Sequence, residues 1–322
     1  MSSMIKLETS VRLFLEDDKN TIITINNIYL KDIKKNMKAD LYTYGGRISF
    51  DNMFRFLQGD LFKGYPSILQ SIIHQAQKKD LDIIGIASLD VKTQIPIGKQ
   101  DRFAYLVNES RTLPKDYTHD KIGKNILEIE NKGKILYLVN AQGICTLDEK
   151  RIRRDFIAIG NNKIPYPIKL EDALKRCQDD GLVVLSKQHL GHLVGLEEKV
   201  VEFKDYFDGL SYSTEAPRKR AEKIIQHSKE IGLPVVVVSG AHTFGNIGRG
   251  YIEIPDDAIN LFNNEKFLES LRTIIKNKNY KNQGKFATPL QNAGWKIPLG
   301  LYSVGWEAGI KKLFGVNYKL KK

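Results

Sequence analysis

Short apolar runs recur through the middle of the chain, and amphipathic segments separate them. Six of these runs are almost entirely apolar or β-branched, as in strands that are buried on both faces. They cover residues 81–87, 135–139, 156–159, 182–186, 209–212 and 234–239. Between them, residues 65–79, 170–179 and 217–231 carry apolar side chains at helical spacing. This alternation predicts an α/β fold with a parallel sheet. A β/α barrel fits it best, and a doubly wound open sheet is the alternative.

We expect three parts along the chain. Residues 1–38 form a β-rich lead, in which the β-branched run at 21–25 is a strand. Residues 39–280 form the barrel, and residues 281–322 form a basic extension that docks back on the barrel through its interleaved apolar side chains. Chemistry in a β/α barrel sits where strands end and loops begin, so the strand ends are the positions to inspect.

The net charge of +12 is concentrated near the C-terminus. From Leu271 to Lys322 the chain has eleven basic side chains and one acid, Glu307. A local excess of this kind indicates an anionic partner, which we expect to be nucleic acid or a phosphorylated partner. The segment Lys276–Lys285 is basic and contains Tyr280, which is the mixture found along phosphate backbones. Two alternatives stay open: the segment lies on an anionic membrane surface, or it contacts an acidic protein.

Composition narrows the class of protein. Hydrophobic residues make up 42% and charged residues 27%, which is ordinary for a globular chain. No apolar stretch reaches the roughly 18 residues that a membrane-spanning helix needs, and the N-terminal residues lack the apolar region of a secretory signal. With only Cys145 and Cys177, the chain indicates a reducing compartment, so we expect a cytoplasmic location.

Five segments at the expected strand ends resemble, in the same order, the signatures of the PHP (polymerase and histidinol phosphatase) family. They are 40–44, 87–90, 141–146, 180–188 and 232–242. The first reads Asp-Leu-Tyr-Thr-Tyr where the family has Asp-Leu-His-x-His, and the last contains Ser-Gly-Ala-His where the family has Ser-Asp-Ala-His. The resemblance implies a distorted seven-stranded β/α barrel that holds two or three metal ions and hydrolyses phosphoesters.

The departures from the family pattern fall on its metal ligands. By the resemblance, these positions are Tyr42, Tyr44, Leu89, Gly143, Lys187, Ser211, Gly240 and His242. Only His242 is a good ligand, whereas divalent cations need several convergent imidazole or carboxylate groups. Lys187 would also place a positive charge where the metal's charge belongs. We therefore predict a non-catalytic PHP-like domain with no catalytic residue, no metal and no cofactor, which acts as a binding or scaffolding protein.

The remaining polar groups allow further hypotheses. Tyr42 and Tyr44 share one face of a strand, where they either fill the space of the metals or stack on a ligand. Two interpretations of Arg47, Lys187 and Arg249 stay open: scattered surface charge, or an anion site with backbone N–H groups of the segment 245–250 beside Arg249. The enzymatic alternative is a metal-dependent phosphoesterase with a displaced site. Its residues would be Asp90, His189, His192 and His242.

Overall fold

The computed structural model describes residues 36–43, 67–89, 101–150, 153–161, 163–164, 168–187, 196, 199–216, 218–241, 244–261, 263–286 and 288. Apart from Asn36, all of them belong to one compact unit that begins at Met37. The strand expected at 21–25 lies outside the described residues. None of the helices in the described part of the chain has the length and apolar character that crossing a bilayer requires.

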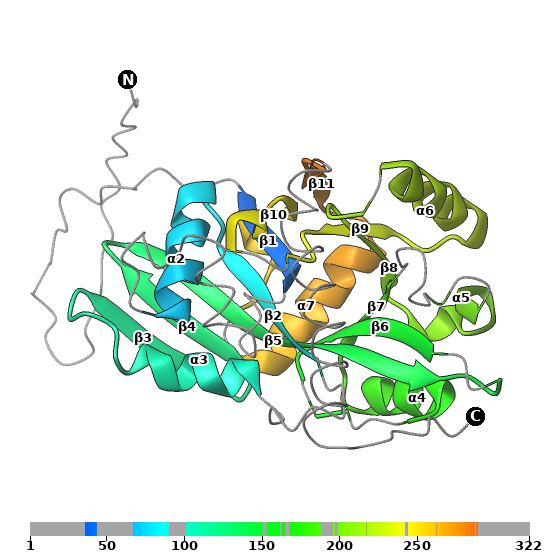
Figure 1. The fold of residues 1–322 in the computed structure, drawn as a ribbon, viewed down its shortest axis with the longest axis horizontal. Coiled ribbons are helices and arrows are strands. Elements are labelled where there is room, and N and C mark those ends of the chain that lie inside the picture. Colours follow the sequence, from blue (N-terminus) through cyan, green and yellow to red (C-terminus); the bar gives the residue numbers. More distant parts are fainter. Residues whose placement is uncertain are drawn as a thin grey trace, which may run out of the picture. The chain divides into compact units, whose positions relative to one another are not determined.

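Seven strands form the barrel wall and follow one another around it (Figure 1). In spatial order they are β1 (Asn36–Thr43), β2 (Ile83–Leu89), β5 (Lys134–Leu147), β6 (Arg153–Ile159), β7 (Val183–Lys187), β8 (Gly209–Ser213) and β9 (Val235–Val238). The ring closes because the chain after β9 returns to β1: the Gly240 N–H donates to the Tyr42 carbonyl at 2.9 Å, and the Thr43 hydroxyl donates to the Ala241 carbonyl at 3.2 Å. The predicted PHP-like α/β barrel is therefore confirmed as a mixed, nearly closed sheet.

Each of the six predicted strands is present; in five of them the boundaries shift by at most three residues, whereas β5 ends eight residues beyond the predicted 139. The sheet is not uniformly parallel, however, because β6 runs antiparallel to both β5 and β7. Four further strands were not predicted: β3 (Tyr117–Ile122) and β4 (Ile126–Asn131) extend the sheet from β5, and β10 (Gly250–Pro255) and β11 (Lys281–Gly284) extend it beyond β1. β11 places the end of the sheet four residues beyond 280, where the barrel was expected to end.

The helices cover the outside of the wall and one of its ends. They are α2 (Ile68–Lys79), α3 (Arg102–Ser110), α4 (Leu170–Asp179), α5 (Lys199–Glu202), α6 (Arg218–Ile231) and α7 (Asn264–Lys276), with short 3₁₀ turns at Lys204–Tyr206, Phe244–Asn246 and Asp256–Ala258. Strand β2 separates two apolar clusters. Ile83 belongs to the cluster that fills the barrel, and Ile84 belongs to the one under α2 and α3, as alternation along a strand requires.

Helix α7 packs at the amino-terminal ends of β7 and β8. The Arg272 guanidinium donates to the carbonyls of Gly181 and Leu182 at 2.9 and 2.8 Å. Arg272 and Lys276 also lie 3.3 and 3.4 Å from a carboxylate oxygen of Asp208, whose side chain is buried. Because α7 covers this end, the opposite, carboxyl-terminal end of the strands is left for a site.

One glycine tests the packing of the wall. A Cβ on Gly85 of β2 would lie 2.0 Å from the Leu41 carbonyl oxygen, whereas a Cβ on Gly245 would meet nothing within 4 Å. We expect Gly85→Ala to lower the free energy of unfolding by about 2–3 kcal/mol because β1 must move away. The matched control Gly245→Ala should change it by less than about 0.5 kcal/mol. Urea unfolding followed by circular dichroism measures both values, and equal stabilities would contradict this account of the β1–β2 contact.

Candidate functional site

A row of polar side chains crosses the carboxyl-terminal end of the barrel interior. Cys145 on β5 is the register partner of Asp155 on β6, and Lys187 on β7 is the register partner of Ser211 on β8. Phe156 and Ser186 are register partners, and Asp155 before Phe156 and Lys187 after Ser186 both lie one step nearer this end, because β6 and β7 are antiparallel. Register partners share a face of the sheet, so the row runs across four strands. Asp155 and Cys145 were not singled out by the sequence reasoning.

Tyr42 meets this row from the other side of the barrel. The Lys187 ammonium lies 3.4 Å from the Tyr42 hydroxyl and 5.3 Å from the centre of its ring. Strands β1 and β7 are not neighbours in the sheet, so this contact spans the barrel interior. Tyr42 is buried and Lys187 is half-buried, so Lys187 is the member of the pair that solvent reaches.

Two further positions of the predicted degenerate metal site lie on the same strand ends. Gly143 on β5 pairs in register with Leu89 on β2. Gly240 has a positive φ of 60°, and a Cβ there would lie 2.3 Å from the Ser213 hydroxyl. A side chain at position 240, including the family's aspartate, would be strained by this φ and would require the Ser213 hydroxyl to move. The predicted site residues Tyr44, Arg47, Asp90, His189, His192 and His242 lie outside the described residues.

The seam between β9 and β1 is held by a buried carboxylate. Asp40 accepts hydrogen bonds from the N–H groups of Ser239 at 3.0 Å and Gly248 at 2.8 Å. Burial raises the pKa of Asp40 to about 6, and the hydrogen bonds from Ser239 and Gly248 limit that rise. Asp40 lies two residues before Tyr42, so the same carboxylate fixes the strand that carries the ring.

The loop after this seam is fixed from three sides. The Lys79 ammonium donates to the carbonyls of Gly245 and Ile247, and burial lowers its pKa to about 8. The Asn246 amide donates to the buried Glu215 carboxylate at 2.8 Å, while Gly248 donates to Asp40.

Arg249 ends this loop, and its side chain is half-buried. Its own N–H and that of Ile247 donate to carbonyls of the loop, at Asn246 and Phe244. The Gly248 N–H is used by Asp40. The N–H groups of Ile247, Gly248 and Arg249 are therefore engaged within the protein, and anion binding at Arg249 stays a prediction.

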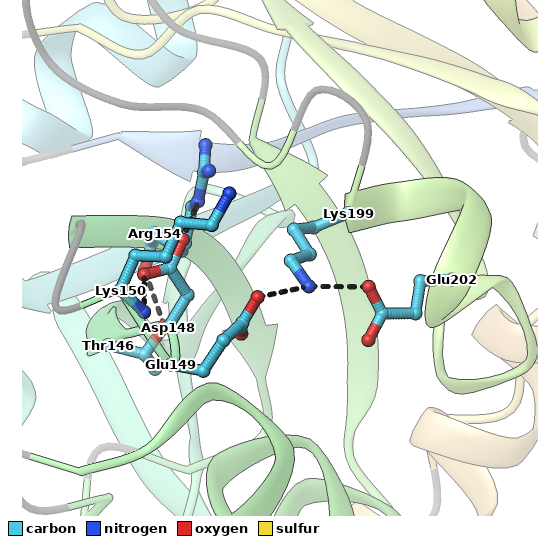
Figure 2. A network of polar contacts seen from close by, with 7 residues as sticks. All are labelled: Thr146, Asp148, Glu149, Lys150, Arg154, Lys199 and Glu202. Carbon is cyan, nitrogen blue, oxygen red and sulfur yellow. Dashed lines mark hydrogen bonds and ion pairs between the residues drawn. The ribbon is translucent and has the colours of Figure 1, made fainter.

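A second polar network stabilises the β5–β6 turn at the same end of the barrel (Figure 2). Buried Asp148 pairs with Arg154 at 3.0 Å. On α5, Lys199 lies 2.7 Å from Glu149 and 2.5 Å from Glu202, and its hydrogen bond to Glu149 lowers the pKa of that carboxyl. The network ties the start of α5 to the turn between β5 and β6.

The structure changes the interpretation of the basic C-terminal region. Tyr280 was expected beside a phosphate backbone, but its hydroxyl donates to the Val235 carbonyl at 2.8 Å, and burial raises its pKa. Arg272 and Lys276 pair with Asp208. These three side chains therefore contribute to the barrel. Residues 289–322, which carry six of the lysines, lie outside the described residues.

Within the described ranges, no three His, Cys, Asp or Glu side chains come together as metal ligands would. The interior row together with Tyr42 presents one ammonium, one carboxylate and three neutral groups. They are Lys187, Asp155, Tyr42, Cys145 and Ser211. Such a set can hold an anion or a hydrogen-bonding ligand, and it lacks the several convergent hard ligands of a metal cluster.

Comparison with known proteins supports the resemblance that the sequence motifs predicted. Residues 219–273 match a family model described as PHP-associated. Among solved structures, the chain is similar to PsfC from Pseudomonas syringae, with 10% identity, a TM-score of 0.44, and coverage of 74% of this chain and 88% of that one. It is also similar to a candidate metal-dependent phosphoesterase from Bifidobacterium adolescentis, with 13% identity, a TM-score of 0.33, and coverage of 55% and 83%. No curated protein matches the sequence.

The raised pKa of Asp40 predicts that the stability of the fold decreases as the pH rises. The folded state keeps the Asp40 proton up to a pH of about 6, whereas the unfolded chain loses it near 3.8. The stability that the protonated group contributes is therefore complete below 3.8 and is lost as the pH rises through about 6. Relative to Asp40→Asn, the free energy of unfolding should fall by about 2–3 kcal/mol between about pH 4 and pH 7. Urea titrations of both proteins test this, and a difference that stays constant or grows with pH would contradict it.

Proposed function

This chain is a PHP-like barrel protein, and from that premise we propose that it binds a phosphorylated ligand at the carboxyl-terminal end of the barrel without a metal ion and without hydrolysing it. The observation that carries the proposal is the position of Lys187. Its ammonium lies inside the barrel against the Tyr42 hydroxyl, at two positions where the family pattern has metal ligands.

A fixed ammonium and a metal cluster have different chemical consequences. The ammonium repels a divalent cation a few ångströms away, and the effect is stronger in a partly buried site than in water. It still attracts a phosphate, to which it donates charge-assisted hydrogen bonds. It cannot lower the pKa of a bound water to near neutrality, which is what a metal ion does in hydrolysis. The described residues therefore favour binding over turnover.

Asp155 and Tyr42 determine how Lys187 is presented. The Lys187 side chain is half-buried, and the hydrogen bond from its ammonium to the Tyr42 hydroxyl restricts where the ammonium lies. The Asp155 carboxylate in the same row limits the net positive charge of the site. A ligand with one phosphate and nearby hydroxyl groups suits this balance better than a bare polyanion, because the carboxylate accepts hydrogen bonds from hydroxyls.

Metal content separates this proposal from the phosphoesterase alternative at Asp90, His189, His192 and His242. Protein purified without chelator should carry no stoichiometric zinc, manganese or iron by elemental analysis, because Lys187 replaces a ligand with a cation. Two or more metal equivalents per chain, together with hydrolysis of 4-nitrophenyl phosphate, would overturn the proposal and favour the displaced site.

Ligand binding tests the role of Lys187 directly. We expect Lys187→Gln to weaken binding of 4-nitrophenyl phosphate by at least about tenfold, since it removes a charge-assisted contact. Isothermal titration calorimetry provides the measurement. The control is Lys121→Gln, which removes an exposed lysine from β3 and should leave the affinity unchanged. Equal affinities in all three proteins would place the anion elsewhere.

A further inference from the structure

A stacked pair of aromatic rings lies on the outer side of the wall, away from the Lys187 row. The rings of Tyr212 on β8 and Phe286 after β11 are 6.0 Å apart between centres, with an angle of 10° between their planes. Tyr212 follows Ser211, which belongs to the interior row, so alternation directs Tyr212 outward. Neither ring is fully covered.

The pair lies close to the start of α6. The Thr214 methyl carbon is 2.9 Å from where a Cβ on Gly284 would be, and Gly284 precedes Phe286 by two residues. Arg218 begins α6 only four residues after Thr214. Between Gly284 and Phe286, the Lys285 N–H is fixed by the Arg249 carbonyl at 2.8 Å, and the Lys285 side chain is exposed.

The first turn of α6 is basic, and contacts within the protein do not account for its charges. It consists of Arg218, Lys219 and Arg220, and it contains no acidic residue. The amino end of a helix already carries partial positive charge, so cations there oppose the helix dipole. Arg218 pairs with Glu222 at 3.3 Å, but both side chains are more than half exposed. One guanidinium nitrogen of Arg220 is shielded from solvent without a hydrogen-bond partner. The fold itself gains little from these charges.

We propose that the aromatic pair Tyr212–Phe286 and the basic residues Arg218, Lys219 and Lys285 together bind single-stranded nucleic acid. Proteins that bind single strands combine a basic track for the phosphates with aromatic rings on which bases stack. A solvated helix face accounts for the charges but not for the rings beside them. A duplex uses the charges but keeps its bases stacked within itself, so the rings favour a single strand.

The test uses the full-length protein and a fluorescent thymidine oligonucleotide of about 20 nucleotides, in anisotropy titrations at salt concentrations from about 50 to 200 mM. Phe286→Ala should weaken binding by about 5- to 100-fold, the range that loss of one stacked base gives. Lys219→Gln combined with Lys285→Gln should lower the slope of log affinity against log salt by about 1.4, since each phosphate contact on a single strand contributes about 0.7. The charge-matched control combines Lys121→Gln and Lys163→Gln, two exposed lysines elsewhere, and should change neither value.

Each other outcome would overturn the proposal. The proposed site would be wrong if the wild-type protein did not bind the oligonucleotide. It would also be wrong if the control protein lost as much affinity as the variants of the site. Binding that survives both sets of substitutions would place the nucleic acid on residues 289–322. Equal affinity for a duplex, with no effect of Phe286→Ala, would leave only an unspecific basic surface. Lys187→Gln should not affect the oligonucleotide, so this test stands apart from the one on the barrel interior.

Discussion

The buried Asp40 carboxylate is the interaction on which the rest of the barrel depends. It joins three segments that are far apart in sequence, because this one side chain of β1 accepts hydrogen bonds from the N–H of Ser239 after β9 and from the N–H of Gly248 in the following loop. A nearly closed ring of short strands needs contacts that hold its first strand against its last strand. Among the described residues, backbone pairing across this seam includes the bond from the Gly240 N–H to the Tyr42 carbonyl. The carboxylate is costly to bury when charged, and its raised pKa is the measure of that cost.

The Asp40 hydrogen bonds also affect the site, because they fix the position of the strand that carries Tyr42. In a metal-dependent barrel, a cluster of cations holds several strand ends in place through their ligands. Here the strand ends are held by groups of lower charge: the Tyr42–Lys187 contact across the interior, the Asp155 carboxylate in the same row, and the Lys199 network at the β5–β6 turn. In the function that we propose, these contacts keep the strand ends in place while the barrel interior binds a ligand.

The sequence predicted the strands well because burial on both faces leaves continuous apolar runs. Strand direction leaves no such trace, so the antiparallel β6 could not be predicted from its pattern. β3 and β11 are largely exposed and polar, and for that reason they were missed. In the candidate site, Lys187 and Tyr42 were found through motif order. Asp155 was missed because its importance depends on register, which brings it into line with Lys187 only after β6 and β7 pair.

The two anion-binding surfaces that we propose differ in the physical property that would select their ligands. The barrel interior presents a single ammonium beside a carboxylate, so its net charge is small and its ligand must supply matching hydrogen bonds. The outer surface presents several cations whose charges are not balanced within their own helix turn, with rings beside them. Binding at the first should depend weakly on salt and strongly on the shape of the ligand. Binding at the second should depend strongly on salt, because each phosphate that it neutralises releases condensed counterions. The net charge of +12 therefore does not by itself say which ligand each surface binds, since the two surfaces place their cations among different neighbours.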